Sequence, residues 1–363
     1  MTPTMEAPVV PIATLTPTTV AVTENTLYRG DLARTGVMDG AGLGSSVQIA
    51  WSVQLDEPSY ASPIEASGLV LVGGDDETMH ALDAETGDTV WEYRASDEIS
   101  SSPAVQDGIA YFGSFDGVFH AIDASNGAGM WTFAAGSEIH SSPAVVDGLV
   151  IFGTYGGTLF ALDASSGAEV WRVETVERIT SSPAIVDGVA IYTDAGGVVR
   201  GVSVADGTVI WRFDSPGSFF ATPAVSEGIA VIGDFVGNIT AISAADGTVI
   251  WQNFIDSVIY SSAAIMEGTV YIGADDGNIY SYDLYSGSEN WRLPTGGEVR
   301  TSPVVAGDQL VIGSYDGTVY GIDRFSGSVL WSQQVGASAS TLVVGETVYA
   351  VSVDGRIVAI TNT

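Results

Sequence analysis

The sequence predicts an all-β protein, an eight-bladed β-propeller of four-stranded antiparallel blades, and three observations lead to this fold. First, the 363-residue chain contains eight tryptophans, and each follows the previous one after 40 residues. A fixed period of this length is typical of repeat architectures whose units pack face to face. Second, each period contains short apolar runs separated by turn residues. Third, no unit shows the 3.6-residue apolar period of a helix.

The tryptophans that define the period are Trp51, Trp91, Trp131, Trp171, Trp211, Trp251, Trp291 and Trp331. The unit that ends at Trp131 illustrates the expected strands, which cover residues 101–105, 109–113, 118–123 and 128–131. Asp107-Gly108, Asp116-Gly117 and Asn126-Gly127 separate these runs. Such dipeptides favour type I′ hairpins, in which both central residues need positive φ. Four strands in about 40 residues is the size of one propeller blade.

The phase of the repeat predicts how the ring closes. Seven complete units end at Trp331, after which only three strand-like runs remain, at 339–343, 347–351 and 357–361. A fourth run, 47–51, is in phase at the start of the chain but has no strands before it. We therefore expect the N-terminal strand to pair into the last blade, which leaves no open edge. A seven-bladed ring with a spare blade would leave such an edge exposed.

A recurring motif resembles that of quinoprotein-type propellers. Residues 81–91 (ALDAETGDTVW) match the pattern AxDxxTGxxxW, with copies ending at Trp131 and Trp171 and looser copies at the next four tryptophans. The segment 28–36 (YRGDLARTG) resembles the lead-in to the first blade of such proteins. The chain is thus similar, over about residues 28–363, to the quinoprotein-like family of PQQ-repeat, BamB-type propellers, with a WD-like repeat architecture.

The resemblance implies that each tryptophan packs blade against blade over a motif glycine, so all eight are expected to be structural. A large flat ring with one N–H donor suits such an interface. Proteins of this family have two very different functions, and the resemblance implies either one. One is a dehydrogenase that holds pyrroloquinoline quinone (PQQ) and calcium in the funnel of the propeller. The other is a non-catalytic scaffold, such as the BamB-type lipoproteins of outer-membrane assembly. The fold does not decide between them.

The composition argues against the enzyme. The chain has no cysteine, and its basic side chains are three histidines and 11 arginines, with no lysine. The resemblance implies that a quinone with three carboxylates needs basic partners, and only Arg178 and Arg300 are expected near the funnel mouth. No residue stands out as a general base. We therefore predict no catalytic residue and no cofactor, with PQQ and calcium as the alternative.

The histidines and acidic runs do not predict a metal site. His80 and His120 occupy equivalent positions on different blades, where they are expected to pack, and His140 begins an inner strand. The run Asp75-Asp76-Glu77 lacks the alternating ligand spacing of a calcium loop. Asp is expected at hairpin turns for backbone reasons alone. No metal ligand is therefore predicted.

One face of the propeller collects the candidate binding residues. The connection from an outer strand to the next inner strand, and the second hairpin of each blade, emerge on the same face. Exposed aromatics gathered on one face are typical of interaction surfaces. The alternative is that they pack down between the loops as a rim of the core. The candidate partner- or ligand-binding residues are Tyr60, Phe115, His140, Tyr155, Arg178, Phe220, Phe235, Tyr260, Arg300 and Tyr315.

The charge balance limits the partners. The net charge is −33, from 44 acidic and 11 basic side chains. Such a surface repels phosphate backbones and anionic membrane surfaces, which argues against nucleic acid as a partner. An acidic, lysine-free chain without cysteine suits an extracytoplasmic location, whether periplasmic, cell-surface or secreted.

The N-terminal residues 1–27 are rich in Thr, Pro and Val, and we expect them to form a stalk that precedes the propeller of residues 28–363. They lack the basic and apolar regions of a signal peptide, and no stretch is apolar enough to cross a bilayer. A membrane tether upstream of residue 1 remains compatible with such a stalk. The alternative is that Val9–Leu15 pairs as an extra strand with a blade edge of a neighbouring molecule, so that the protein is either a monomer or an assembly through this strand.

Taken together, these features predict a non-catalytic, extracytoplasmic scaffold that binds a protein or a ligand through one propeller face. Two alternatives stay open. One is a minimal dehydrogenase dependent on PQQ and calcium. The other is a structural subunit of a surface assembly that uses the N-terminal strand.

Overall fold

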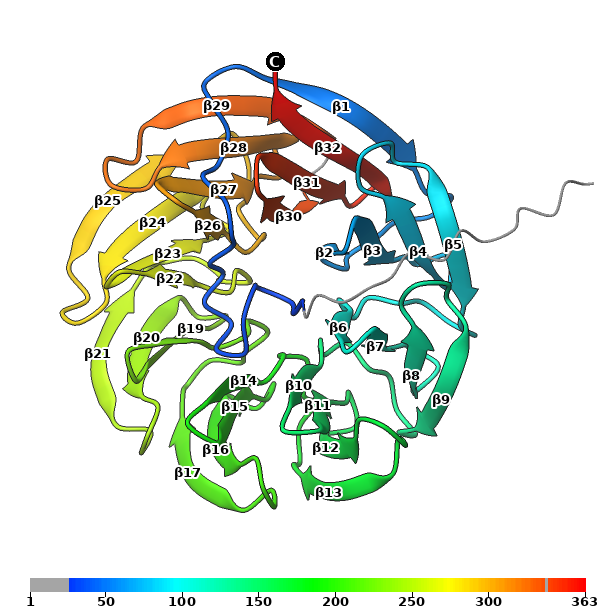
Figure 1. Ribbon diagram of the computed structural model, residues 1–363. Helices are drawn as coiled ribbons and strands as arrows, with labels where there is room; N and C mark the ends of the chain where they lie inside the picture. The colour runs from blue at the N-terminus through cyan, green and yellow to red at the C-terminus, as the bar shows by residue number, and fades with distance from the viewer. Residues whose placement is uncertain (1–25, 337–338) are drawn as a thin grey trace, which may run out of the picture.

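The computed structural model describes residues 26–336 and 339–363, which form a ring of eight four-stranded antiparallel sheets (Figure 1). We number these sheets as blades 1 to 8. The described residues contain no helix, so none could span a membrane as a helix. The predicted all-β, eight-bladed architecture is confirmed. In every blade, the innermost strand belongs to the wall of the central channel and the fourth strand lies at the rim (Figure 1).

The strands of blades 1 to 4 are β2 (Ile64–Ala66), β3 (Leu69–Gly73), β4 (Thr78–Asp83), β5 (Thr89–Arg94), β6 (Ala104–Gln106), β7 (Ile109–Gly113), β8 (Val118–Asp123), β9 (Gly129–Ala134), β10 (Ala144–Val146), β11 (Leu149–Gly153), β12 (Thr158–Asp163), β13 (Glu169–Glu174), β14 (Ala184–Val186), β15 (Val189–Thr193), β16 (Val198–Ser203) and β17 (Val209–Asp214).

The strands of blades 5 to 8 are β18 (Ala224–Ser226), β19 (Ile229–Gly233), β20 (Asn238–Ser243), β21 (Val249–Phe254), β22 (Ala264–Met266), β23 (Thr269–Gly273), β24 (Asn278–Asp283), β25 (Glu289–Pro294), β26 (Val304–Ala306), β27 (Gln309–Gly313), β28 (Thr318–Asp323), β29 (Val329–Gln334), β30 (Ala339–Val344), β31 (Thr347–Ser352), β32 (Arg356–Asn362) and, from the start of the chain, β1 (Val47–Gln54).

The ring closes as the phase of the repeat predicts. Strand β1 pairs antiparallel with β32, from Val47 opposite Asn362 to Gln54 opposite Arg356. The closing blade therefore takes three strands from the end of the sequence and its rim strand from the start. Because the start of the chain pairs with its end, β32 is not left as an exposed edge and the closing blade has four strands like the others.

The tryptophans dock neighbouring blades together. Each lies on a rim strand one residue after a β-bulge, and a bulge bends its strand and turns a side chain toward a new direction. Trp131, for example, donates its indole N–H to the Ala164 carbonyl of the next blade at 3.0 Å. Its ring covers Gly167, where a Cβ would lie 2.5 Å from Cε3. The same arrangement holds for the seven tryptophans from Trp51 to Trp291, with distances of 2.7–3.1 Å to a carbonyl 33 residues on.

The interface at the closing blade differs from the other seven. Trp331 has no motif glycine or backbone carbonyl opposite its ring and instead donates to Gln309 Oε1 at 3.2 Å. The same Oε1 accepts the Leu43 N–H at 3.0 Å, and the Gln309 amide donates back to the Leu43 carbonyl. One buried glutamine thus ties the tryptophan to the chain segment that leads into β1. The expectation that every tryptophan covers a glycine is wrong at this interface, because β1 has Val47 at the position of the motif glycine.

The hairpin prediction holds for only one of the three turns in a blade. In the first hairpin, Asp107 and Gly108 have φ of 52° and 78°, as a type I′ turn requires. In the second and third hairpins only one residue is in this region, usually a glycine such as Gly117 or Gly127 and in blade 1 Glu77. These two turns are longer, and the Asp123 carboxylate closes the third by accepting the Ser125 N–H at 2.8 Å. The motif aspartate is therefore a loop acceptor.

A row of hydrogen bonds links seven of the inner strands just before they begin. The backbone N–H of Ser102 donates to the hydroxyl of Ser142 in the next blade at 3.1 Å, and Ser142 does the same to Ser182 at 2.9 Å. Six such bonds of 2.8–3.1 Å run without interruption from Ser62 to Ser302. Each hydroxyl satisfies a backbone donor that would otherwise be buried without a partner.

The segment before β1 runs across the channel. Figure 1 shows it, in blue, at the centre of the ring. Its carbonyls accept backbone N–H groups from inner strands of five blades, for example Ile185 N–H to Leu32 at 2.6 Å and Val305 N–H to Gly36 at 2.8 Å. Thr26 bridges Val105 of blade 2. The predicted Val9–Leu15 strand and most of the predicted stalk lie outside the described residues.

Two buried arginines fix this segment to the channel wall. Arg34 donates to the carbonyls of Pro183 at 3.1 Å and Pro143 at 2.8 Å, and Arg29 donates to the carbonyls of Ala263 and Pro303. Burial lowers the pKa of Arg34 to about 10, which still leaves it protonated at neutral pH. Charge-assisted bonds to carbonyls on opposite sides of the channel therefore hold this segment across it.

The docking geometry predicts that Gly167→Ala is much more destabilising than Gly148→Ala. Both glycines have positive φ, 70° and 77°, so both substitutions incur the left-handed penalty of about 1–2 kcal/mol. Only at Gly167 would the new Cβ also collide with Trp131, which adds roughly 1–3 kcal/mol, whereas nothing lies within 4 Å of Gly148. Urea unfolding of the two variants measures the difference. Equal free energies of unfolding would contradict the docking role of the tryptophan.

Candidate functional site

The candidate residues lie where the sequence places them, on the face formed by the outer-to-inner connections and the second hairpins. In the structure the two kinds of loop are hydrogen-bonded to each other within a blade. The Phe115 N–H donates to the Glu98 carbonyl at 2.9 Å, and the Tyr155 N–H donates to the Glu138 carbonyl at 2.8 Å. We call this face of the propeller the funnel face.

Side chains on the funnel face form a continuous stack, which begins at blade 2. The ring of Phe115 lies 4.1 Å from that of His140, which lies 5.1 Å from that of Tyr155. The guanidinium of Arg178 then lies 5.0 Å from the Tyr155 ring centre and 5.7 Å from the Phe220 ring centre. A cation between two aromatic faces is an attractive arrangement, so Arg178 joins blades 3 and 4 to blade 5.

The stack continues from blade 5 to blade 7. Phe220 and Phe235 lie parallel at 5.3 Å, and Phe235 contacts Tyr260 at 4.7 Å. The guanidinium of Arg300 then lies 4.8 Å from the Tyr260 ring and 5.3 Å from the Tyr315 ring. Nine of the ten candidate residues thus form one chain of ring and cation contacts, which we call the aromatic belt.

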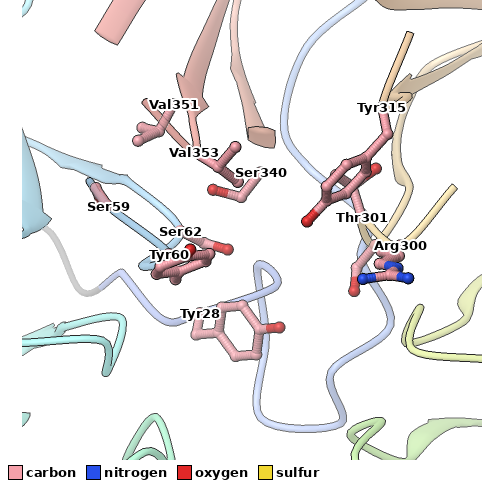
Figure 2. Close-up of a pocket in the computed structure, with 11 residues that line it drawn as sticks. Tyr28, Ser59, Tyr60, Ser62, Arg300, Thr301, Tyr315, Ser340, Val351 and Val353 are labelled. Atoms are coloured by element: carbon pink, nitrogen blue, oxygen red, sulfur yellow. The ribbon is translucent and has the colours of Figure 1, made fainter. Parts of the chain in front are cut away.

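The tenth candidate, Tyr60, borders a cavity at the end of the belt. The cavity has a volume of about 210 Å³, and Tyr28, Tyr60, Arg300 and Tyr315 contribute its large side chains. Figure 2 shows Tyr60 and Tyr315 on opposite sides of the cavity, with Tyr28 rising from the N-terminal segment. Tyr28 was not among the predicted site residues. The lead-in motif of which it is part was visible in the sequence, but only the folded chain shows that this motif enters the channel.

The belt side chains are more buried than the sequence-based picture of free aromatics implies. Tyr60 is 61% exposed, whereas Tyr155 and Tyr315 are 36% exposed and the other members are half-buried. The belt side chains cover one another by stacking. Each of the two predicted arrangements, exposed aromatics and aromatics packed between the loops, therefore describes part of the belt. The rim they form still borders solvent on the funnel face.

The two arginines of the belt differ in their ion pairs. Arg300 pairs with Asp275 through two hydrogen bonds of 3.0 Å and with Glu298 at 2.7 Å. The hydrogen bond to Asp275 raises the pKa of Arg300. Arg178 donates only to the Tyr155 hydroxyl at 3.0 Å, and its Nε is buried without an acceptor among the described residues. The charge of Arg300 is therefore compensated within the chain, and that of Arg178 is not.

His140 is a packing member of the belt. It lies between Phe115 and Tyr155, and its Nε2 is 3.3 Å from Glu138 Oε2. Burial lowers its pKa below the usual range despite that contact. The imidazole is therefore neutral at neutral pH and presents an aromatic surface rather than a charge.

A second cavity of the funnel face, at blade 1, is strongly acidic. Seven carboxylates line it, with Arg94 and His80: Asp56, Glu57, Asp75, Asp76, Glu77, Glu92 and Glu98. The Oδ1 atom of Asp75 is buried and has no partner in the described part of the chain. Burial, followed by the charges of Glu98, Asp76 and Glu57, raises the pKa of Asp75 to about 6. No group of three or more His, Asp or Glu side chains in residues 26–336 and 339–363 has a geometry that could hold a metal ion.

Comparison with solved structures defines the fold class of the protein. The fold is that of the quinoprotein-like eight-bladed propellers, shared with BamB from Moraxella catarrhalis (22% identity, TM-score 0.75, covering 87% of this chain and 97% of that one). It is also shared with a europium-containing methanol dehydrogenase (13% identity, TM-score 0.83, covering 93% and 97%). A computationally designed propeller, Ika8, matches as well (19% identity, TM-score 0.78, covering 86% and 99%). At these identities the likeness shows the fold alone.

The sequence itself gives the family. The profile of the outer membrane protein assembly factor BamB family matches residues 47–140, 115–263 and 237–363, which together cover every blade. The chain therefore belongs to this family. A search of curated proteins finds no significant match.

The funnel of this chain fits a quinone cofactor poorly. A cofactor with three carboxylates needs several uncompensated cations, and Arg300 is already paired with Asp275 and Glu298. Arg178 is the one belt arginine without a carboxylate partner among the described residues. The cavity of about 210 Å³ beside Tyr28 is also smaller than the roughly 300 Å³ at which ligand pockets begin. The residues of the funnel therefore do not meet the requirements of such a group.

The acidic cavity predicts a pH-dependent effect of Asp75→Asn. A carboxyl whose pKa is higher in the folded than in the unfolded state destabilises the fold once it is ionised, so the penalty appears as pH rises from about 4 through 6. The variant should therefore melt above wild type at pH 8 and together with wild type at pH 4. The gain at pH 8 should be only roughly 1–2 °C, because the carboxylate is partly exposed and solvent screens its charge. Asp308→Asn, at a carboxylate 79% exposed, is the control for the change of charge. A gain of equal size at both pH values would contradict this account.

Proposed function

We propose that this protein is a non-catalytic scaffold that works outside the cytoplasm and recognises a protein partner through the aromatic belt. The observation that carries the proposal is the belt itself, in which rings and guanidinium groups from blades 2 to 7 lie in contact on one face. Aromatic side chains and arginine are the residues most enriched at the energetically important centres of protein interfaces. Because they are held by stacking, little side-chain entropy is lost when a partner covers them.

Membership of the BamB family supports a role in protein assembly, since the family is described by a factor that assembles outer-membrane proteins. The M. catarrhalis BamB shares the fold. The acidic, lysine-free composition supports a location in the periplasm or at the cell surface. A tether upstream of residue 1, and assembly through Val9–Leu15, remain proposals that concern residues outside the described part of the chain.

The absence of a catalytic role is likewise part of the proposal. Two features support it, the compensated charge of Arg300 and the small cavity above Tyr28. The dehydrogenase relatives share the fold at 13–15% identity, and fold alone does not carry activity.

Replacing Phe115, Phe235 and Tyr315 together with Ser should reduce capture of the partner from an envelope extract by tenfold or more, because the belt loses three ring contacts. The control replaces Met130, Tyr285 and Phe325 with Ser, which are 53%, 53% and 61% exposed and lie outside the belt. Quantitative pull-down with the three proteins measures the effect. Unchanged capture by the belt variant would rule out the belt as the recognition surface.

Calorimetric titration of the full chain with PQQ in the presence of calcium should give no saturable heat, because too few uncompensated cations face the funnel. The Arg178→Gln variant serves as the comparison. Micromolar binding of PQQ to the wild-type chain, abolished in this variant, would contradict the proposal of a non-catalytic protein. It would indicate a quinone site in the funnel.

A further inference from the structure

Arg178 places a positive charge at a loop position where three other blades carry glutamate and the remaining blades carry neutral residues. It occupies the loop position at which Glu98, Glu138 and Glu298 enter blades 2, 3 and 7. Since the units have the same length and fold, the substitution places a cation where three other blades place a carboxylate. The loop does not require a cation for its structure, because the same loop bond is made in blade 3 with Glu138 and in blade 4 with Arg178, at 2.8 and 2.9 Å from their carbonyls.

The other arginines of the chain have acceptors that account for them. Those near a carboxylate are Arg94, Arg172, Arg200, Arg212, Arg292, Arg300 and Arg324. Arg29 and Arg34 donate to backbone carbonyls in the channel, and Arg356 donates to the Val335 carbonyl at 3.4 Å. Arg178 is the arginine on the belt that has only a phenol as its acceptor within the described residues.

The orientation of Arg178 leaves one edge of its guanidinium available. The two flanking rings of Tyr155 and Phe220 hold its plane, and Nη1 donates one hydrogen to the Tyr155 hydroxyl. The second hydrogen of Nη1 and those of Nη2 have no acceptor among residues of the described chain. A guanidinium with an available edge of this kind matches the two oxygens of a carboxylate.

We propose that Arg178 binds a carboxylate of an extended peptide segment of the protein partner, while Tyr155 and Phe220 receive apolar side chains on either side of it. This inference rests on the proposed function and names the chemistry that the belt selects. The partner's segment carries a single acidic group among neutral or basic ones, because Glu98, Glu138 and Glu298 on the same face repel further negative charge.

The test uses two blocked peptides that differ in one group, acetyl-Gly-Phe-Asp-Phe-Gly-amide and its Asn counterpart, titrated into the full chain by calorimetry at low millimolar concentration. We expect the Asp peptide to bind wild type about tenfold more tightly, as a charge-assisted bidentate contact would give. Arg178→Gln should bind both peptides with the weaker affinity. Arg212→Gln, which removes the same charge from an exposed pair with Asp214 on the rim, should behave as wild type.

Three outcomes would overturn the proposal: equal affinity of wild type for the two peptides, no binding of either, or an equal loss in the two arginine variants. The pull-down with the belt variant separates this proposal from the proposed function. If Phe115, Phe235 and Tyr315 are needed for partner capture but Arg178→Gln captures normally, the belt is the recognition surface and the carboxylate contact is wrong. If neither variant affects capture, both proposals fail.

Discussion

The contact of an indole ring with a glycine across each blade interface is the constraint on which the rest of this structure depends. A side chain at the glycine would meet the ring at 2.5–2.8 Å, so the interface admits one residue type on one side and a large flat ring on the other. Seven repetitions of the same contact fix the angle between blades, and the angle fixes how many blades close the ring. At the eighth interface Gln309 supplies the hydrogen bonds that the motif supplies elsewhere. A single departure is tolerated because seven equivalent interfaces already hold the ends of the ring together.

The centre of the ring depends on a second set of interactions. Six hydroxyl-to-backbone bonds join the beginnings of the inner strands, and the segment around Arg29 and Arg34 donates to carbonyls on opposite sides of the channel. Because chain occupies the channel, the surface open to a partner lies above it, where the connections and second hairpins emerge. Tyr28 of this segment lines the same cavity as Arg300 and Tyr315 of the belt, so the crossing segment borders the end of the belt.

The two arginines of the belt differ in how their charges are compensated. Arg300 is neutralised by Asp275 and Glu298, and its role is to join Tyr260 to Tyr315. Arg178 joins Tyr155 to Phe220 in the same way, but no carboxylate of the described residues compensates its charge. The two arginines therefore stack alike but differ in charge compensation, and a partner that distinguishes blade 4 from blade 7 would do so by charge rather than by shape. The acidic cavity at blade 1 adds a contrasting charge on the same face.

The sequence by itself determined the blade count, the closure by residues 47–54 and the face on which the ten candidate residues lie, because each of these follows from a period of 40 residues and from strand alternation. It overestimated the type I′ turns, since an Asp-Gly pair also occurs in longer loops closed by the aspartate side chain. Only the tertiary structure decided that the lead-in segment crosses the channel, that Gln309 completes the last interface, and that Arg178 and Arg300 differ in their partners. These features join residues more than 20 and up to 274 positions apart, and no local pattern encodes which carboxylate or carbonyl a long side chain will reach.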